Sequence, residues 1–138
     1  EILAASAQPE DPSRVINLGS VMGEIPMGDQ AYSYSVSKAG VHHMTKILAK
    51  ELGPRRITIN ALAPGPFQSG MTKFALGEDK GSARVAARVP AGRLGRPEDI
   101  AGAIQFLCGA GGAYVTGAIL PLSGGINVAT GPSIFGED

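Results

Sequence analysis

Three short, mostly apolar segments, each followed closely by small or cyclic residues, constrain the fold of this chain more than any other feature. The segments are 14–18, 57–62 and 118–122, and the breaks after them are Gly19-Ser20, Pro64-Gly65-Pro66 and Ser123-Gly124-Gly125. Such runs, bounded in this way, are typical of strands that are buried on both faces of a sheet. Pro121 cannot donate a hydrogen bond to a neighbouring strand, so the third segment is predicted to lie at an edge.

Helical periodicity fills the sequence between these segments. Residues 34–52 carry a stripe at steps of three and four, formed by Tyr34, Lys38, Val41, Thr45, Leu48 and Leu52, and Gly53-Pro54 follows as a stop signal. Residues 97–108 are a second predicted helix, with proline in the first turn and an apolar stripe at Ile100, Ile104 and Leu107. The order strand, helix, strand, helix, strand predicts an α/β fold with a parallel sheet. Ligands of such sheets lie beyond the carboxyl ends of the strands.

Tyr34 and Lys38 form a candidate proton-transfer pair. Side chains four residues apart on a helix are neighbours, so this spacing places an ammonium group beside a phenol. A nearby cation eases the ionisation of a phenol, which can then exchange a proton with a carbonyl or an alcohol. Ser20 follows the first predicted strand, and its hydroxyl could hold the same oxygen. The spacing also arises by chance, and Ser20 could equally cap a turn, so the surrounding sequence has to decide.

Composition argues against several other classes of function. The 12 basic and 12 acidic residues give a formal net charge of +0, which leaves no basic footprint for nucleic acid. No apolar run approaches the roughly 20 residues that cross a bilayer. Cys108 is the single cysteine and is expected to pack as a small core residue. His42 and His43 are adjacent, point in different directions on a helix and are not expected to share a metal ion.

Ordered motifs along most of the chain point to a known family. They are Asn17-Leu18-Gly19-Ser20, Tyr34 to Lys38 followed by Ala39-Gly40, residues 59–65, residues 90–101, Tyr114-Val115-Thr116-Gly117 and Ser123-Gly124-Gly125. From Arg14 to Val128, this series resembles the C-terminal half of a short-chain dehydrogenase/reductase, and within that family it is similar to the 3-oxoacyl-[acyl-carrier-protein] reductases. The resemblance implies a Rossmann-like, doubly wound parallel sheet of which only the C-terminal half is present.

The resemblance also implies a role for each matching residue. Tyr34 corresponds to the catalytic acid/base, Lys38 to the lysine that tunes it and holds the nicotinamide ribose, and Ser20 to the serine that binds the substrate carbonyl. The residues implied in cofactor binding are Tyr34, Lys38, Pro64, Gly65, Phe67 and Ser69, and those implied in substrate binding are Ser20, Gln30 and Met71. Pro64 and Gly65 would form the turn beside the nicotinamide, and Ser69 stands in the place of a threonine. No metal ligand is implied.

The chain departs from the family in what precedes the first predicted strand. The sequence contains neither the glycine-rich turn that binds a dinucleotide nor the residue that selects between NAD and NADP. We therefore expect residues 1–138 to form one partial domain that lacks the N-terminal dinucleotide-binding half and begins with the tail of a helix. Residues 130–138 are expected to form a flexible or dimer-facing tail. Residues 71–88 are either an ordinary loop and helix or a lid over the substrate.

These expectations define three hypotheses for function. The first is reduction of a ketone, such as a 3-oxoacyl thioester, to a secondary alcohol, with NADP(H) favoured over NAD(H) as cofactor. The second is a dehydrogenase of sugars or secondary alcohols with the same site, and the third is a non-catalytic fragment that serves in dimerisation. The resemblance further implies a cytoplasmic homodimer or homotetramer formed through the helix at 34–52. Its substrate would be a small molecule or an acyl thioester, with no nucleic-acid or membrane partner.

The isolated 138-residue chain is expected to fold poorly or to aggregate. A partial sheet leaves one strand edge open, and an open edge pairs readily with other chains. The measurement is a thermal melt of this chain followed by circular dichroism. A sharp, cooperative transition would contradict the expectation.

Overall fold

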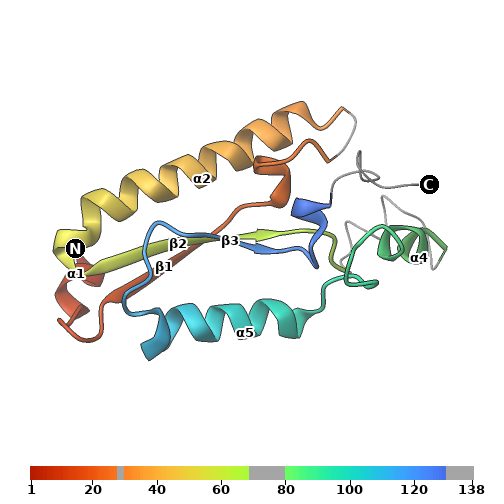
Figure 1. Ribbon diagram of the computed structural model, residues 1–138. Coiled ribbons are helices and arrows are strands. Elements are labelled where there is room, and N and C mark those ends of the chain that lie inside the picture. The colour runs from red at the N-terminus through yellow and green to blue at the C-terminus, as the bar shows by residue number, and fades with distance from the viewer. Residues whose placement is uncertain (28–29, 69–79, 130–138) are drawn as a thin grey trace, which may run out of the picture.

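The computed structural model describes residues 1–27, 30–68 and 80–129. Within these ranges, strands and helices follow each other in the predicted order (Figure 1). The strands are β1 (Ser13–Leu18), β2 (Ile57–Pro64) and β3 (Ile119–Leu122). The α-helices are α1 (Ile2–Ser6), α2 (Tyr32–Leu52), α4 (Lys80–Ala86) and α5 (Pro97–Cys108), and the short 3₁₀ helices are η1 (Val21–Gly23), η2 (Gly53–Arg55), η3 (Ala110–Gly112) and η4 (Ile126–Val128).

The strands form a parallel sheet in the order β1-β2-β3. β1 is in register with residues 57–62 of β2, so that Leu18 lies opposite Leu62. β3 pairs with the last part of β2, where Leu122 lies opposite Pro64. In the described part of the sheet, β3 is therefore an edge strand, which confirms the position predicted from Pro121.

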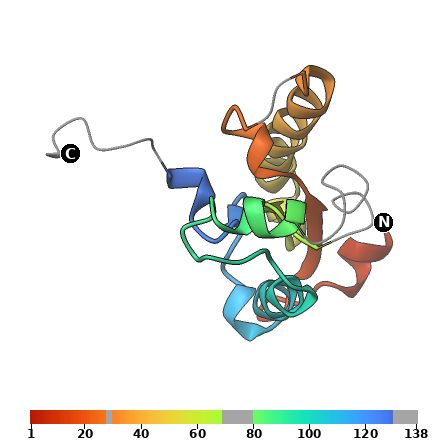
Figure 2. The ribbon, with the colours of Figure 1, turned by 90° about the vertical axis from the view of Figure 1, so that its right-hand side faces the viewer.

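The connections between the parallel strands cover both faces of the sheet. α2 connects β1 to β2 and lies along one face, whereas α5 precedes β3 and lies along the other (Figure 1). Seen from the carboxyl ends of the strands, the sheet lies between these two helices (Figure 2). This is the doubly wound arrangement that the family resemblance implies. Both helices begin at the end of the molecule where the strands finish, and so the starts of the helices and the strand ends meet there.

β2 forms the centre of the core. Its residues 57–63 are all buried, and Ile59, Ala61 and Leu62 are at most 1% exposed. Ala49 of α2 packs against Ile59 from one face of the sheet. Such continuous burial is what a parallel strand requires when helices cover both faces.

α2 begins two residues earlier than predicted, and its deepest side chains differ from the predicted stripe. The buried residues are His42, Thr45 and Ala49, of which Thr45 alone belongs to that stripe. The other members are half-buried, except Tyr34, which is 41% exposed. The prediction therefore identified the side of α2 that faces the sheet but overlooked His42.

α5 has the predicted bounds, but two of its side chains lie where they were not expected. Leu107 is buried, whereas Ile104 is 39% exposed and Cys108 is exposed. The prediction that Cys108 packs in the core is wrong, because a step of one residue turns a side chain about 100° away from Leu107. Instead of the thiol, the Arg14 guanidinium meets this helix end, since Nε donates to Leu107 O at 3.2 Å and Nη2 to Gly109 O at 3.2 Å. A cation at a helix C-terminus is favoured by the helix dipole.

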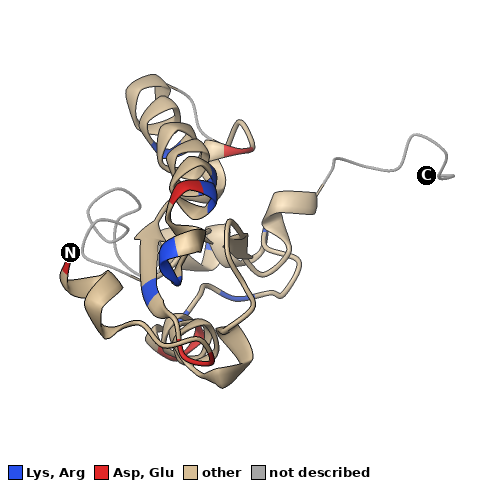
Figure 3. Cartoon of the chain, turned by 90° about the vertical axis from the view of Figure 1, so that its left-hand side faces the viewer, with Lys and Arg blue, Asp and Glu red and all other residues tan. Residues whose placement is uncertain are grey.

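Basic and acidic residues are interspersed along the described chain in the view of Figure 3. Arg14 pairs with Asp11, and Arg93 pairs with Asp99. α2 extends over 21 residues, but neither it nor any other helix in the described ranges combines the length and apolarity needed to cross a bilayer.

Asn60 ties the loop before β3 to the middle of the sheet. Its fully buried side chain donates from Nδ2 to Val115 O at 2.8 Å and accepts at Oδ1 from Ala118 N at 3.0 Å. Asn60→Ala leaves two partly buried backbone groups without their partner, so the free energy of unfolding of the full-length gene product should fall by about 2 to 4 kcal/mol. Urea unfolding measures this, with Gln105→Ala, an exposed amide on α5, as the control. A loss as small as that of the control would show that the contact contributes little.

Candidate functional site

The breaks after the three strands meet at one edge of the sheet. The backbone N–H of Gly19 donates to Leu62 O at 2.8 Å, and that of Gly65 donates to Leu122 O at 2.9 Å. A Cβ at position 65 would lie 2.9 Å from Ser123 Cα, so glycine is needed there for the turn to pack against the loop after β3. The convergence that the sequence predicts is therefore present.

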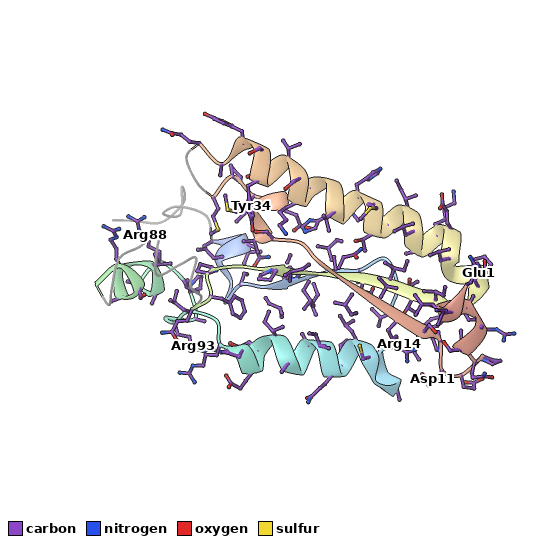
Figure 4. All side chains as sticks on the ribbon, turned by 180° about the vertical axis from the view of Figure 1, so that it is seen from behind. Glu1, Asp11, Arg14, Tyr34, Arg88 and Arg93 are labelled. Carbon is purple, nitrogen blue, oxygen red and sulfur yellow. The ribbon has the colours of Figure 1, made fainter. Side chains whose placement is uncertain are left out.

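Tyr34 and Lys38 lie one helical turn apart on α2 at this edge. Figure 4 shows Tyr34 toward the end where the strands finish, away from Arg14 and Glu1 at the opposite end. Lys38 Nζ lies 5.6 Å from the centroid of the Tyr34 ring, within the range of a cation–π contact. The same Nζ donates to Leu18 O at 2.9 Å. Lys38 thus joins the start of α2 to the end of β1.

Ser20 is nearly buried and stands at the start of η1. It is 5% exposed, and its Oγ accepts a hydrogen bond from Met22 N at 3.2 Å, which makes it the N-cap of that short helix. The interpretation of Ser20 as a cap is therefore confirmed. It leaves the functional interpretation intact, because a hydroxyl that accepts one hydrogen bond keeps its own proton to donate.

His42 adds a third polar side chain at the next step of four along α2. Its Nε2 accepts from the backbone N–H of Ser20 at 3.3 Å, and its Nδ1 lies 3.5 Å from Glu24 Oε1. Burial lowers the pKa of His42 below its usual value, the Glu24 carboxylate opposes this, and Lys46 and Lys38 add to the lowering. Sequence reasoning considered this histidine only as a metal ligand. The signal that could have found it is its spacing of four from Lys38.

Of the remaining predicted site residues, the structure describes some and not others. Ser69 and Met71 lie outside the described residues. Gln30 is exposed, shortly before α2, and has a φ of 61°, a left-handed conformation that residues other than glycine rarely adopt. Pro64 is the last residue of β2 and is half-buried, as is Gly65.

Phe67 lies against Gly95. The two residues form an isolated parallel bridge, and a Cβ at Gly95 would overlap the Phe67 ring. The ring helps to line a cavity of about 230 Å³. Leu122, Ser123 and Gly124 at the end of β3 also line it, whereas Ser20, Tyr34 and Lys38 do not.

Arg93 on the wall of that cavity is engaged within the chain. Its Nη1 and Nη2 donate to the two carboxylate oxygens of Asp99 at 2.7 and 2.9 Å. These hydrogen bonds, together with one from Arg96 N, lower the pKa of Asp99 to about 2. Arg93 thus serves a local salt bridge, and its guanidinium gives no reason to expect an anionic ligand there.

In the part of the chain that the structure describes, no group of three or more His, Cys, Asp or Glu side chains is arranged so that it could hold a metal ion. His42 is buried and His43 is exposed. The two histidines therefore face different surroundings, as their adjacency on a helix predicts.

A doubly wound parallel sheet with a phenol, an ammonium group and a hydroxyl at its carboxyl edge places the chain among the Rossmann-like α/β proteins. A family model described as enoyl-(acyl carrier protein) reductase matches residues 3–127. The chain belongs to the short-chain dehydrogenase/reductase family of oxidoreductases.

Curated proteins and solved structures that resemble this chain match most of its length. It is 44% identical over 127 residues to the rhamnolipids biosynthesis 3-oxoacyl-[acyl-carrier-protein] reductase of Pseudomonas aeruginosa, a match that covers 92% of this chain and 50% of that protein. It is 45% identical over 113 residues to the 3-oxoacyl-[acyl-carrier-protein] reductase FabG of Vibrio cholerae, which covers 82% and 45%. The solved Pseudomonas aeruginosa RhlG/NADP active-site complex superposes with a TM-score of 0.84 at 45% identity, covering 91% of this chain and 50% of that one. The chain thus spans about half the length of the curated relatives it matches.

Proposed function

We propose that this protein reduces a ketone to a secondary alcohol with NADP(H), and that the ketone belongs to a 3-oxoacyl thioester. The observation that carries the proposal is the position of Ser20, Tyr34 and Lys38 at the carboxyl edge of one parallel sheet. The relatives support the substrate class, since two of them are named 3-oxoacyl-[acyl-carrier-protein] reductases, and a similar solved structure is an NADP complex.

Each of the three side chains has its own task in the proposed reaction. The Ser20 hydroxyl donates to the ketone oxygen and fixes its position, since the same hydroxyl already accepts from Met22 N. The Tyr34 phenol gives its proton to that oxygen as negative charge develops on it. The Lys38 ammonium, held by Leu18 O near the Tyr34 ring, stabilises the phenolate that remains.

The residues at this edge fit the nicotinamide end of NADP(H). An ammonium group has three protons to donate, and Lys38 uses one on Leu18 O, so two remain for ribose hydroxyls. The half-buried turn at Pro64 and Gly65 lies at the same edge. When bound, the nicotinamide would supply the hydride for the carbonyl carbon. The sequence holds no glycine-rich turn for the pyrophosphate, and none of these residues is assigned to it.

The test is an assay of the full-length gene product with NADPH and a 3-oxoacyl thioester. We expect NADPH to be oxidised as an equal amount of 3-hydroxyacyl thioester forms, and simple secondary alcohols with NADP⁺ to react far more slowly. Faster turnover of sugars or simple alcohols would favour a sugar or alcohol dehydrogenase instead. A titration in which NADPH does not bind would favour a non-catalytic dimerisation module.

Tyr34→Phe separates the proton-donor role from packing. Phenylalanine keeps the ring that Lys38 contacts but removes the hydroxyl, so turnover should fall by at least about 100-fold while NADPH affinity stays largely unchanged. Steady-state kinetics and a fluorescence titration measure the two quantities. Tyr32→Phe is the matched control, because Tyr32 belongs to the same turn of α2 and is 78% exposed. If the Tyr34 variant kept more than about a tenth of the activity, the proton-donor role would be refuted.

We also propose that the protein is cytoplasmic and assembles as a homodimer or homotetramer. The outer face of α2 supports the assembly. Val36, Met44 and Ile47 are 72%, 46% and 44% exposed and recur at helical spacing. Gly40 lies between them, and a Cβ there would meet no other described part of the chain within 4 Å. An exposed apolar stripe with a shallow centre suits close approach of a second helix.

Met44→Glu tests this assembly. A carboxylate in the apolar stripe would have to be desolvated in the contact, so the molar mass in solution should fall to that of a smaller assembly. Size-exclusion chromatography with light scattering measures the mass. Lys46→Glu introduces the same side chain at an exposed position off the stripe and should leave the mass unchanged. An unchanged mass in the Met44 variant would exclude this face as the interface.

A further inference from the structure

His42 is a buried, titratable side chain to which the proposed reaction gives no task. It is 5% exposed, lies one turn beyond Lys38 on α2 and faces the loop that carries Ser20. On the basis of the proposed function, we propose that His42 is a positioning residue that holds Ser20 where its hydroxyl meets the substrate oxygen. The hydrogen bond from Ser20 N to His42 Nε2, at 3.3 Å, is the contact through which it acts.

The shape of the loop supports a dedicated contact with the imidazole ring. A Cβ at Gly19 would overlap His42 Nε2, and a Cβ at Gly23 would lie 3.0 Å from His42 Cε1. Both ends of the loop therefore close directly onto the ring, which residues with a side chain would prevent. The loop is also tight, because Gly23 N donates to Ser20 O at 2.9 Å. A shift of the His42 ring would therefore move Ser20 as well.

The polarity of this contact determines the protonation state in which His42 works. A backbone N–H can only donate, so Nε2 must be unprotonated to accept from Ser20, and the neutral ring carries its proton on Nδ1, 3.5 Å from Glu24 Oε1. Protonation of Nε2 would turn it into a donor that faces the Ser20 N–H, which is also a donor, and the hydrogen bond would be lost.

The charged groups around the ring keep this contact in place at neutral pH. They are Glu24 beside η1, which favours the imidazolium, and Lys38 and Lys46 on α2, which disfavour it, as burial does more strongly. The pKa of His42 is therefore lowered, and the neutral, accepting form persists at pH 7. As the pH falls through this lowered pKa, the imidazolium forms and Ser20 is released.

A second contact between α2 and the end of β1 does not involve His42. Lys38 Nζ donates to Leu18 O at 2.9 Å, so Lys38 should stay in place when the imidazole is removed. Loss of His42 should therefore lower the rate of reduction through Ser20 without weakening the binding of NADPH, which a general loss of structure would weaken as well.

A double-mutant cycle on the full-length gene product tests this coupling. His42→Leu should lower kcat for the 3-oxoacyl thioester by about tenfold, with an unchanged Kd for NADPH. In a Ser20→Ala background, the same change should have almost no further effect, because the hydroxyl that His42 positions is already gone. If the effects of His42→Leu and Ser20→Ala simply multiply, His42 does not act through Ser20 and the inference is wrong.

The pH profile supplies a readout that a purely structural role would not move, and it decides the question if His42→Leu does not fold. Glutamine offers a carbonyl oxygen that accepts from Ser20 N but does not titrate, so His42→Gln should recover most of the rate lost in His42→Leu. It should also remove the fall in kcat on the acid side. His43→Gln, at the exposed neighbour, is the matched control and should keep that acid limb. An acid limb that persists in His42→Gln would overturn the inference.

The two proposals can fail separately. If the wild-type protein reduces no ketone with NADPH, or if Ser20→Ala leaves turnover unchanged, the proposed function or its serine is at fault. If Ser20→Ala abolishes turnover while His42→Leu leaves kcat intact, only the role of His42 is refuted. Nitrogen-15 NMR of the histidine rings gives an independent check, because an accepting Nε2 and a protonated Nδ1 have distinct chemical shifts.

Discussion

Three side-chain hydrogen bonds hold α2 against the end of β1, and the candidate site depends on them. They join Asn17 to Thr45, Leu18 to Lys38 and Ser20 to His42. Apolar packing alone holds a helix on a sheet but leaves it freer to slide and turn, whereas directional contacts fix its rotation. This rotation decides that Tyr34, on the same side of α2, comes to the edge where the strands end.

The parallel arrangement of the strands explains why these groups gather at all. A parallel connection must return along the length of the sheet, so the chain leaves the end of β1, passes through α2 and enters β2 at the far end. The loop after β1 and the first turns of α2 are therefore neighbours by topology. Glycine at positions 19, 23 and 65 then removes the side chains that would keep these segments apart. The positions of Ser20 and Tyr34 thus follow from topology and close packing together.

Sequence reasoning predicted the features that depend on the local spacing of residues. It missed the features that depend on contacts between residues far apart in the chain. The strands, the α/β order with its parallel sheet and the pairing of Tyr34 with Lys38 were accessible, because each rests on residues a few positions apart. The doubly wound arrangement was implied by the family resemblance. The contact of His42 with Ser20 was not accessible, since its partner is a backbone N–H 22 residues earlier in the chain. Cys108 was placed in the core by its residue type, whereas its helical position next to Leu107 turns it toward solvent. Sites at Ser69 and Met71 remain predictions.

Ser20 shows why the cap and the functional group need not be alternatives. Its Oγ accepts from Met22 N, and its own backbone N–H donates to His42, so both sides of the residue are oriented before any substrate arrives. A hydroxyl held in this way loses little further freedom when it donates to a carbonyl oxygen, and pre-organised donors are the ones that stabilise developing charge most effectively. In the proposed reaction, the capping contact is thus the means by which an ordinary serine becomes a directed donor. His42 contributes to the same orientation in our proposal, through its hydrogen bond with Ser20 N.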